Sequence, residues 1–166
     1  MNKDRILILD KERIARKIHR MAYQAWEYNS NEKSVTLIGI ESAGAVLANN
    51  LAKTLREISP LNVEVISINI NKRKPLTSDT IVDTDLTGRS VILVDDVADS
   101  GRTLLYALRP LLSYEMKKIL IAVLVDRKHK SYPVSADIVG HSIATTLQEH
   151  IEVEHENGII TAAYLQ

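Results

Sequence analysis

The sequence predicts a single α/β domain over residues 1–166, built on a mainly parallel central sheet with helices on both faces. Strand-like and helix-like segments alternate along most of the chain, which is the order that a parallel sheet with crossover helices requires. The central strand candidates are unbroken apolar and β-branched runs, as is typical of strands that are buried on both faces. A chain of 166 residues is long enough for one domain with a substantial core and short for two.

The first half of the chain begins with a short strand and a long amphipathic helix. Asp10 stands where a helix cap is expected. Ile14, Ile18, Met21 and Ala25 recur at the spacing of one helical face. The expected elements are a strand at 5–9, a helix at 11–28, a strand at 35–40, a helix at 45–58 and a strand at 63–70.

The second half contains a long segment without a hydrophobic period, residues 71–89, which carries Lys72, Arg73 and Lys74. Loops of this length in a compact domain usually act as lids or mobile segments, so we expect a flexible excursion between strands. The remaining expected elements are a strand at 91–94, a helix at 101–113, a strand at 119–125 and shorter strands at 138–139, 151–153 and 159–164. In a parallel sheet, ligands bind outside the carboxyl ends of the strands, so the loops that follow the strands are expected to converge on the site.

The composition narrows the class of protein. Charged residues make up 25% and apolar residues 45% of the chain, as in ordinary soluble globular proteins. The 21 basic and 21 acidic side chains balance, which argues against a surface wholly adapted to nucleic acid but permits a local basic face. There is no cysteine, so disulfides, thiolate catalysis and cysteine metal sites are excluded. No apolar run is long enough for a secretory signal or a membrane span, so we expect a cytoplasmic protein without membrane association.

One stretch, VILVDDVADSGRT at 91–103, suggests chemistry. Asp95 and Asp96 stand side by side at the end of a buried strand, where mutual repulsion and desolvation call for a partner. A small polar loop follows at the start of a helix, and such a helix end suits a phosphate. The carboxylates would then face sugar hydroxyls or a hydrated divalent cation such as Mg²⁺. The loop consists of Ala98, Asp99, Ser100, Gly101, Arg102 and Thr103.

This stretch resembles the phosphoribosyl-pyrophosphate (PRPP) binding motif of type I phosphoribosyltransferases, which has an apolar strand, an acidic pair, a small-residue loop and a helix. Two later segments, AVLVDR at 122–127 and ADIVG at 136–140, are similar to the bifunctional pyrimidine-operon attenuator and uracil phosphoribosyltransferase family. The order of strand, helix and strand that ends in Ile38-Gly39-Ile40 is similar too.

The resemblance implies a type I phosphoribosyltransferase fold with a flexible cover loop at 71–89 and a small hood, and a homodimer or higher homo-oligomer. It implies a reaction in which a nucleobase nitrogen displaces pyrophosphate from C1 of PRPP, with Mg²⁺ as cofactor. Asp95 and Asp96 would bind the ribose hydroxyls and the magnesium ion, and residues 98–103 the 5-phosphate. The other implied sites are a pyrophosphate loop at Glu41, Ser42, Ala43 and Gly44, cover-loop cations at Lys72, Arg73 and Lys74, and a base pocket at Asp126, Arg127, Ile138 and Val139.

The identity of the base has two interpretations. Similarity along the whole chain favours uracil, with UMP and pyrophosphate as products. Asp99 favours 6-oxopurines (hypoxanthine, guanine or xanthine), because hypoxanthine-guanine phosphoribosyltransferases place an aspartate there that takes a proton from the ring. Asp99 would alternatively cap the following helix. The chain also has Leu147 where the attenuator family has an arginine near the base pocket, and Asp126 and Arg127 where the purine enzymes have a lysine-bearing segment.

A third interpretation is a non-catalytic regulator that senses PRPP or a nucleotide and binds RNA. The predicted pyrophosphate loop lacks basic side chains, so only backbone N–H groups would bind pyrophosphate there unless a cover-loop cation reaches it. A basic stripe on the first helix could bind RNA, although such stripes are more often solvated faces. The stripe consists of Arg13, Arg16, Lys17 and Arg20. The histidines at 129, 141, 150 and 155 lack the spacing of metal ligands, so we expect no zinc site.

Overall fold

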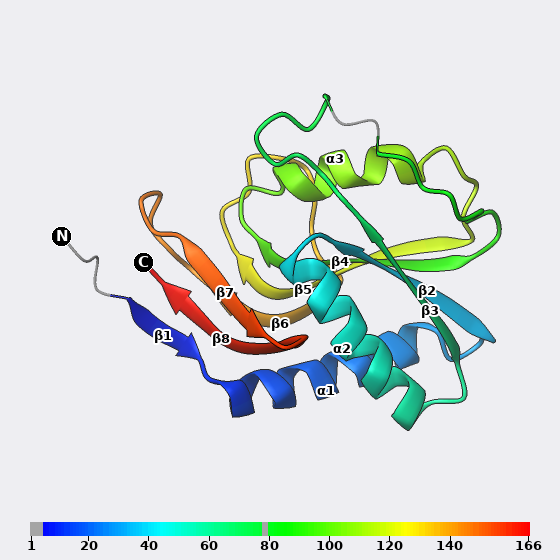
Figure 1. The fold of residues 1–166 in the computed structure, drawn as a ribbon, viewed down its shortest axis with the longest axis horizontal. Coiled ribbons are helices and arrows are strands. Elements are labelled where there is room, and N and C mark those ends of the chain that lie inside the picture. Colours follow the sequence, from blue (N-terminus) through cyan, green and yellow to red (C-terminus); the bar gives the residue numbers. More distant parts are fainter. Residues whose placement is uncertain (1–4, 78–79) are drawn as a thin grey trace.

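The computed structural model describes residues 5–77 and 80–166, and its centre is a five-stranded parallel sheet (Figure 1). Residues 78 and 79 of the predicted cover loop therefore lie outside the described residues. The strand order is β3-β2-β4-β5-β6, and every neighbouring pair is parallel. The predicted α/β class with a parallel sheet is confirmed. The strands are β2 (Ser34–Ile40), β3 (Asn62–Ile68), β4 (Ser90–Ala98), β5 (Lys118–Arg127) and β6 (Ile138–Ile143).

Helices cover both faces of this sheet and each face has its own core (Figure 1). Helices α1 (Lys11–Tyr28) and α2 (Ala43–Ile58) lie on one face, and α3 (Arg102–Leu111) lies on the other. Burial on both faces explains why the central strands read as unbroken apolar runs.

Helix α1 has the bounds that the sequence predicts. Asp10 caps it, since its side chain accepts a hydrogen bond from the backbone N–H of Arg13 at 2.8 Å. Its apolar stripe faces the core through Ile14, Ile18, Met21, Ala22 and Ala25.

A second, smaller sheet forms the hood. Strands β1 (Ile6–Leu9), β7 (Ile151–Glu156) and β8 (Ile159–Leu165) pair antiparallel in the order β1-β8-β7, so the first and last strands of the protein lie side by side there (Figure 1). A two-residue Asn157-Gly158 turn joins β7 to β8, and both residues have positive φ, as the tight turn requires. This sheet places the start of β7 beside the carboxyl end of β4.

Strand β4 is longer than predicted. It continues through Asp95 and Asp96 to Ala98, because β5 runs beside it to Arg127 and extends the parallel ladder. The acidic pair thus lies within a regular strand and not in the loop beyond it. Helix α3 begins one residue later and ends two residues earlier than the predicted 101–113.

The cover segment is partly anchored. Val82 and Leu86 are buried in the core on the α3 side of the sheet, and the hydroxyl of Tyr114 donates to the carbonyl of Val82 at 2.7 Å. The flexible excursion expected over the whole of 71–89 is therefore held on the body of the protein in its second part. No helix in the described ranges is long and apolar enough to cross a membrane.

Candidate active site

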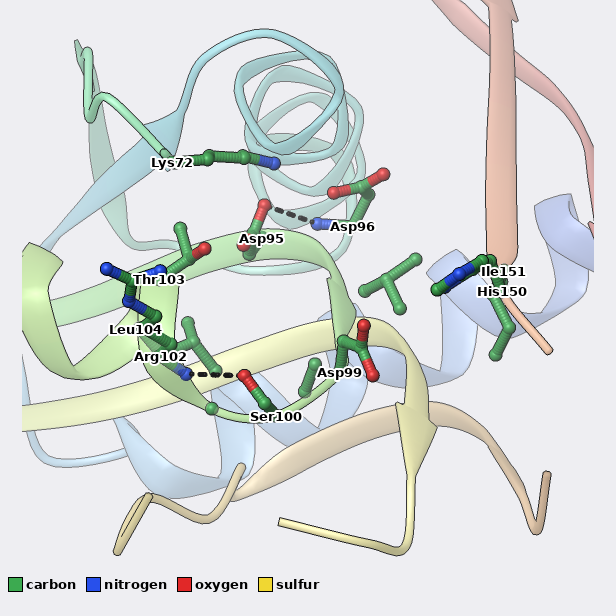
Figure 2. Close-up of a pocket in the computed structure, with 13 residues that line it drawn as sticks. Lys72, Asp95, Asp96, Asp99, Ser100, Arg102, Thr103, Leu104, His150 and Ile151 are labelled. Atoms are coloured by element: carbon green, nitrogen blue, oxygen red, sulfur yellow. Dashed lines mark hydrogen bonds between the residues drawn. The ribbon is translucent and has the colours of Figure 1, made fainter. Parts of the chain in front are cut away.

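A cavity of about 370 Å³ opens at the carboxyl end of β4 (Figure 2). The acidic pair and all six residues of the 98–103 loop line it, together with Lys72 from the cover segment and His150 and Ile151 from the hood. The structure thus brings together the two sets of residues that the sequence singled out in VILVDDVADSGRT. Figure 2 separates a loop half, with residues 100–103, from a hood half, with Asp99, His150 and Ile151, and Lys72 extends toward the acidic pair.

The loop half is a rigid turn that leads into α3. Gly101 is the N-cap with φ +86°, a conformation that L side chains rarely adopt. The backbone carbonyl of Ser100 accepts hydrogen bonds from the backbone N–H groups of Ser131 and Tyr132 at 3.0 and 3.1 Å, and these bonds stabilise the turn. The N-cap Gly101 has no side chain, and the hydroxyl of Ser100 accepts one N–H of the first turn, that of Arg102 at 3.3 Å, so the other N–H groups of this helix end can bind an anion. The alternative that Asp99 is the cap is therefore wrong.

The acidic pair combines burial with mutual repulsion. Asp95 is 1% exposed and accepts the backbone N–H of Asp96 at 3.0 Å, whereas Asp96 is half-buried. Burial, and then the neighbouring charge of Asp96, raises the pKa of Asp95 well above its usual value, and Lys72 opposes the shift. A ligand that supplies hydroxyl donors or positive charge relieves this cost.

The carboxylates fit a magnesium ion that arrives with a phosphorylated substrate. Mg²⁺ is commonly held by one or two carboxylates, with water and substrate oxygens in the rest of its shell. In the described ranges no group of three His, Cys, Asp or Glu side chains gathers in a metal-binding cluster. Asp95 and Asp96 are the two residues of the site that could hold such an ion together with substrate oxygens.

The predicted pyrophosphate loop, Glu41–Gly44, lies against the acidic pair from the side of β2. A Cβ at Gly44 would stand 2.9 Å from the carbonyl oxygen of Val94 and 3.0 Å from both Cα and Oδ1 of Asp95. Glycine at this position lets the loop backbone approach the carboxylate closely. The backbone N–H of Glu41 donates to Ile68 at 2.9 Å and fixes the start of the loop.

Only one of the three predicted cover-loop cations reaches the cavity. Lys72 lines it and points its ammonium group toward the acidic pair (Figure 2). The backbone N–H groups of Arg73 and Lys74 close a turn on the side chain of Asn71 at 3.1 and 3.0 Å, and their side chains are exposed outside the cavity.

The predicted base pocket is divided. Asp126 pairs with Lys130, and Arg127 is a buried partner of Asp99. Like Asp126 and Arg127, Ile138 and Val139 do not line the cavity. They begin β6 and pair with Ala122 and Val123 in the middle of β5, level with Val94 and Asp95.

The residues at the site end of β6 are the last ones of that strand. Ser142 and Ile143 pair with Asp126 and Arg127. The sequence placed this strand at 138–139 only, so its run toward the site was missed.

The sequence also missed His150 and Ile151. Alternation at 151–153 predicted a strand, but no local signal places that strand at the mouth of the cavity. The placement comes from the hood, where the backbone groups of His150 and Gln166 exchange hydrogen bonds at 2.8 and 2.9 Å. Hood strands brought together from the two ends of the chain thus supply this wall.

Comparisons with known proteins agree with this geometry. A family model described as the phosphoribosyl transferase domain matches residues 7–157. Curated relatives named Bifunctional protein PyrR include one from Haemophilus ducreyi, 32% identical over 96% of each chain. Another, from Roseiflexus, is 37% identical over 87% of this chain and 84% of its own.

Solved structures share the fold. A hypoxanthine-guanine phosphoribosyltransferase from Bacillus anthracis superposes with a TM-score of 0.76 at 20% identity, over 94% of this chain and 96% of its own. The hypoxanthine phosphoribosyltransferase of Trypanosoma cruzi has a TM-score of 0.76 at 18% identity, over 94% of each chain. Because the family model spans most of the sequence and curated relatives match at 32–37% identity, the chain belongs to the phosphoribosyltransferase family, a class of pentosyltransferases.

Proposed function

We propose that the protein transfers the phosphoribosyl group of PRPP to uracil, with release of UMP and pyrophosphate. The observation that carries the proposal is a cavity in which an acidic pair, with Asp95 buried, adjoins the N-terminal end of a helix whose N-cap is a glycine. A ligand with a phosphate at one end and vicinal hydroxyls in its middle matches this order of groups. Whole-chain similarity to proteins named Bifunctional protein PyrR supports a pyrimidine base.

In the proposed reaction, the 5-phosphate binds the loop half. Backbone N–H groups of the first turn of α3 and the hydroxyls of Ser100 and Thr103 donate to it. Asp95 and Asp96 accept the ribose hydroxyls. Magnesium held there with the substrate would supply positive charge that balances the leaving pyrophosphate.

The transfer itself forms one bond and breaks one. A ring nitrogen of the base bonds to C1 of the ribose as the bond from C1 to the pyrophosphate oxygen breaks. Pyrophosphate leaves with the electron pair of that bond, beside Lys72 and the backbone of the 41–44 loop. The proton of the ring nitrogen passes to Asp99, whose carboxylate is 56% exposed and lines the hood half.

Asp99 also supports a second candidate, a 6-oxopurine base. A carboxylate in the hood half can accept a ring N–H from hypoxanthine, guanine or xanthine as well as from uracil. The solved structures with this fold include hypoxanthine-guanine enzymes, but their low identity bears on the fold alone.

The regulatory alternative depends on the basic stripe of α1. Arg13 and Arg20 each donate to backbone carbonyls, at 2.9 Å to Ile8 and at 2.7 Å to Gly140, so half of the stripe has a structural role. Burial, followed by the charges of Lys17 and Arg13, lowers the pKa of His141, which supports a positive field on this face. RNA affinity that falls steeply with salt would support this role.

The test is pyrophosphate release from PRPP and Mg²⁺ with uracil, hypoxanthine, guanine and xanthine offered separately. We expect turnover with uracil. Turnover with a purine alone would establish the second candidate. PRPP binding without turnover of any base would favour the regulatory alternative and overturn the enzymatic proposal.

A homodimer and a cytoplasmic location are also part of the proposal. Light scattering tests whether the protein is a homodimer.

A further inference from the structure

Arg127, the last residue of β5, is an unusual buried cation. Its side chain is 7% exposed, and a guanidinium at that depth is tolerated only when its N–H groups are paired. Three of its nitrogens have partners. Nε donates to the hydroxyl of Thr145 at 2.6 Å, Nη2 donates to the carbonyl of Thr146 at 2.8 Å, and Nη1 donates to the carboxylate of Asp99.

These partners belong to two separate loops that enclose the cavity. Asp99 lies in the turn after β4, and Thr145 and Thr146 lie in the loop that joins β6 to the hood. That loop ends at His150, which lines the hood half of the cavity together with Asp99 (Figure 2). The guanidinium therefore connects Asp99 to the loop that leads to His150.

The loop after β6 is itself folded around this contact. The carboxylate of Glu149 accepts the backbone N–H of Thr146 at 2.6 Å. This bond, aided by the charge of Arg127, lowers the pKa of Glu149. Because this bond fixes Thr146, its carbonyl is a well-positioned acceptor for Arg127 on the hood side.

Arg127 also orients Asp99. Because Nη1 engages Oδ1, the carboxylate is held in one direction and its other oxygen stays available to a ligand. Arg127 itself does not line the cavity.

We propose that Arg127 is a positioning residue that determines base affinity: it fixes Asp99 and the hood loop so that the hood half accepts a ring N–H of the nucleobase. The inference rests on the proposed function for the identity of the ligand. It differs from the base pocket predicted from the sequence, because Arg127 acts through Asp99 and the hood loop and does not touch the base.

Ribose 5-phosphate and nucleoside monophosphates separate the two halves of the cavity. Ribose 5-phosphate carries only the groups that the loop half and the acidic pair bind, whereas UMP and IMP add a base. We would measure the affinity of all three ligands by calorimetry for the wild type, R127K, T145V and D99N. Lysine keeps the charge but cannot donate to three partners at once.

We expect the wild type to bind UMP or IMP more tightly than ribose 5-phosphate. R127K should weaken the tighter monophosphate about tenfold or more, with ribose 5-phosphate changed less than about twofold. T145V removes one acceptor while it keeps the side-chain shape, so a smaller loss of the same selectivity is expected. R56K is a matched control, since Arg56 donates to the carbonyl of Val63 at 2.7 Å away from the cavity, and it should change neither affinity.

Equal loss of ribose 5-phosphate and monophosphate in both R127K and T145V would overturn the inference, as would no loss in either. A wild type that binds UMP and IMP no better than ribose 5-phosphate would overturn it too. T145V keeps the test decisive if R127K does not fold. Selectivity that depends on Arg127 in a protein without turnover would refute the proposed enzyme and leave the positioning role intact.

Discussion

The two halves of the cavity are built in different ways. The loop half comes from one stretch, in which strand, turn and helix follow each other within 91–103, and its ligand groups are mainly backbone N–H groups. The hood half is lined by Asp99, His150 and Ile151, which come from separate parts of the sequence, and Arg127 and Thr145 support it from outside the cavity. A phosphate site can therefore be carried by local chain geometry, whereas base recognition depends on how separate loops pack.

The largest effect is expected when the acidic pair, which adjoins both halves, is neutralised. The double variant D95N/D96N should lose Mg²⁺-dependent PRPP binding by about a hundredfold or more, because two charge-assisted ligands disappear at once. Calorimetry with PRPP and Mg²⁺ measures this loss. D85N, a change in an exposed acid of the cover segment, is the control. Unchanged PRPP affinity in the double variant would show that the acidic pair does not bind PRPP, which would contradict the account of both halves.

The next effect distinguishes Lys72 from its neighbours. K72Q should weaken PRPP about tenfold while ribose 5-phosphate changes little, because the ammonium group stands where pyrophosphate is expected to leave. K74Q, on the same segment but outside the cavity, should change neither affinity. Equal effects of K72Q and K74Q would show that only the general charge of the segment matters.

A smaller effect is expected where the 41–44 loop packs against β4 at Asp95. G44A introduces a Cβ about 3.0 Å from Asp95 and should push the 41–44 loop away, costing about 1–3 kcal/mol of stability. Urea unfolding measures it. S42A is the control, since the Ser42 side chain makes no cap hydrogen bond and its loss should be near neutral. A stable G44A variant with full PRPP affinity would contradict the close approach of the 41–44 loop to Asp95.

The smallest effect concerns pH. Burial raises the pKa of Asp95 in the folded protein above its unfolded value, so the folded chain holds a proton that the unfolded chain releases. The corresponding stability is complete below the unfolded pKa and is lost as the pH rises through the folded pKa. The ligand-free wild type should therefore lose stability relative to D95N across this interval, measured as urea midpoints at a series of pH values. A difference that does not change with pH would contradict a raised pKa.

The sequence predicts the loop half well for the same reason that this half is local. Strand period, acidic pair, glycine and helix start all occur within VILVDDVADSGRT, and each has a direct physical meaning. The full length of β4 was missed because the pairing with β5, and not the local sequence, extends the strand past Asp96.

The hood half could be predicted only in part. Asp99 and Arg127 were singled out, but nothing near either residue indicates that they form an ion pair. His150 lines the cavity because β1 and β8 place β7 there, a consequence of topology. Ile138 and Val139 were assigned to the site because they adjoin a family-like segment. Their register with β5 puts them level with Val94 and Asp95, but they do not line the cavity.

The central claim is that one cavity holds PRPP with its phosphate on the loop half and its ribose on the acidic pair. A crystal structure with PRPP and Mg²⁺ tests it most directly. The account predicts the 5-phosphate on the backbone N–H groups of 100–103, the ribose hydroxyls on Asp95 and Asp96, and C1 facing Asp99. A 5-phosphate bound elsewhere, or a ribose turned away from the acidic pair, would contradict it.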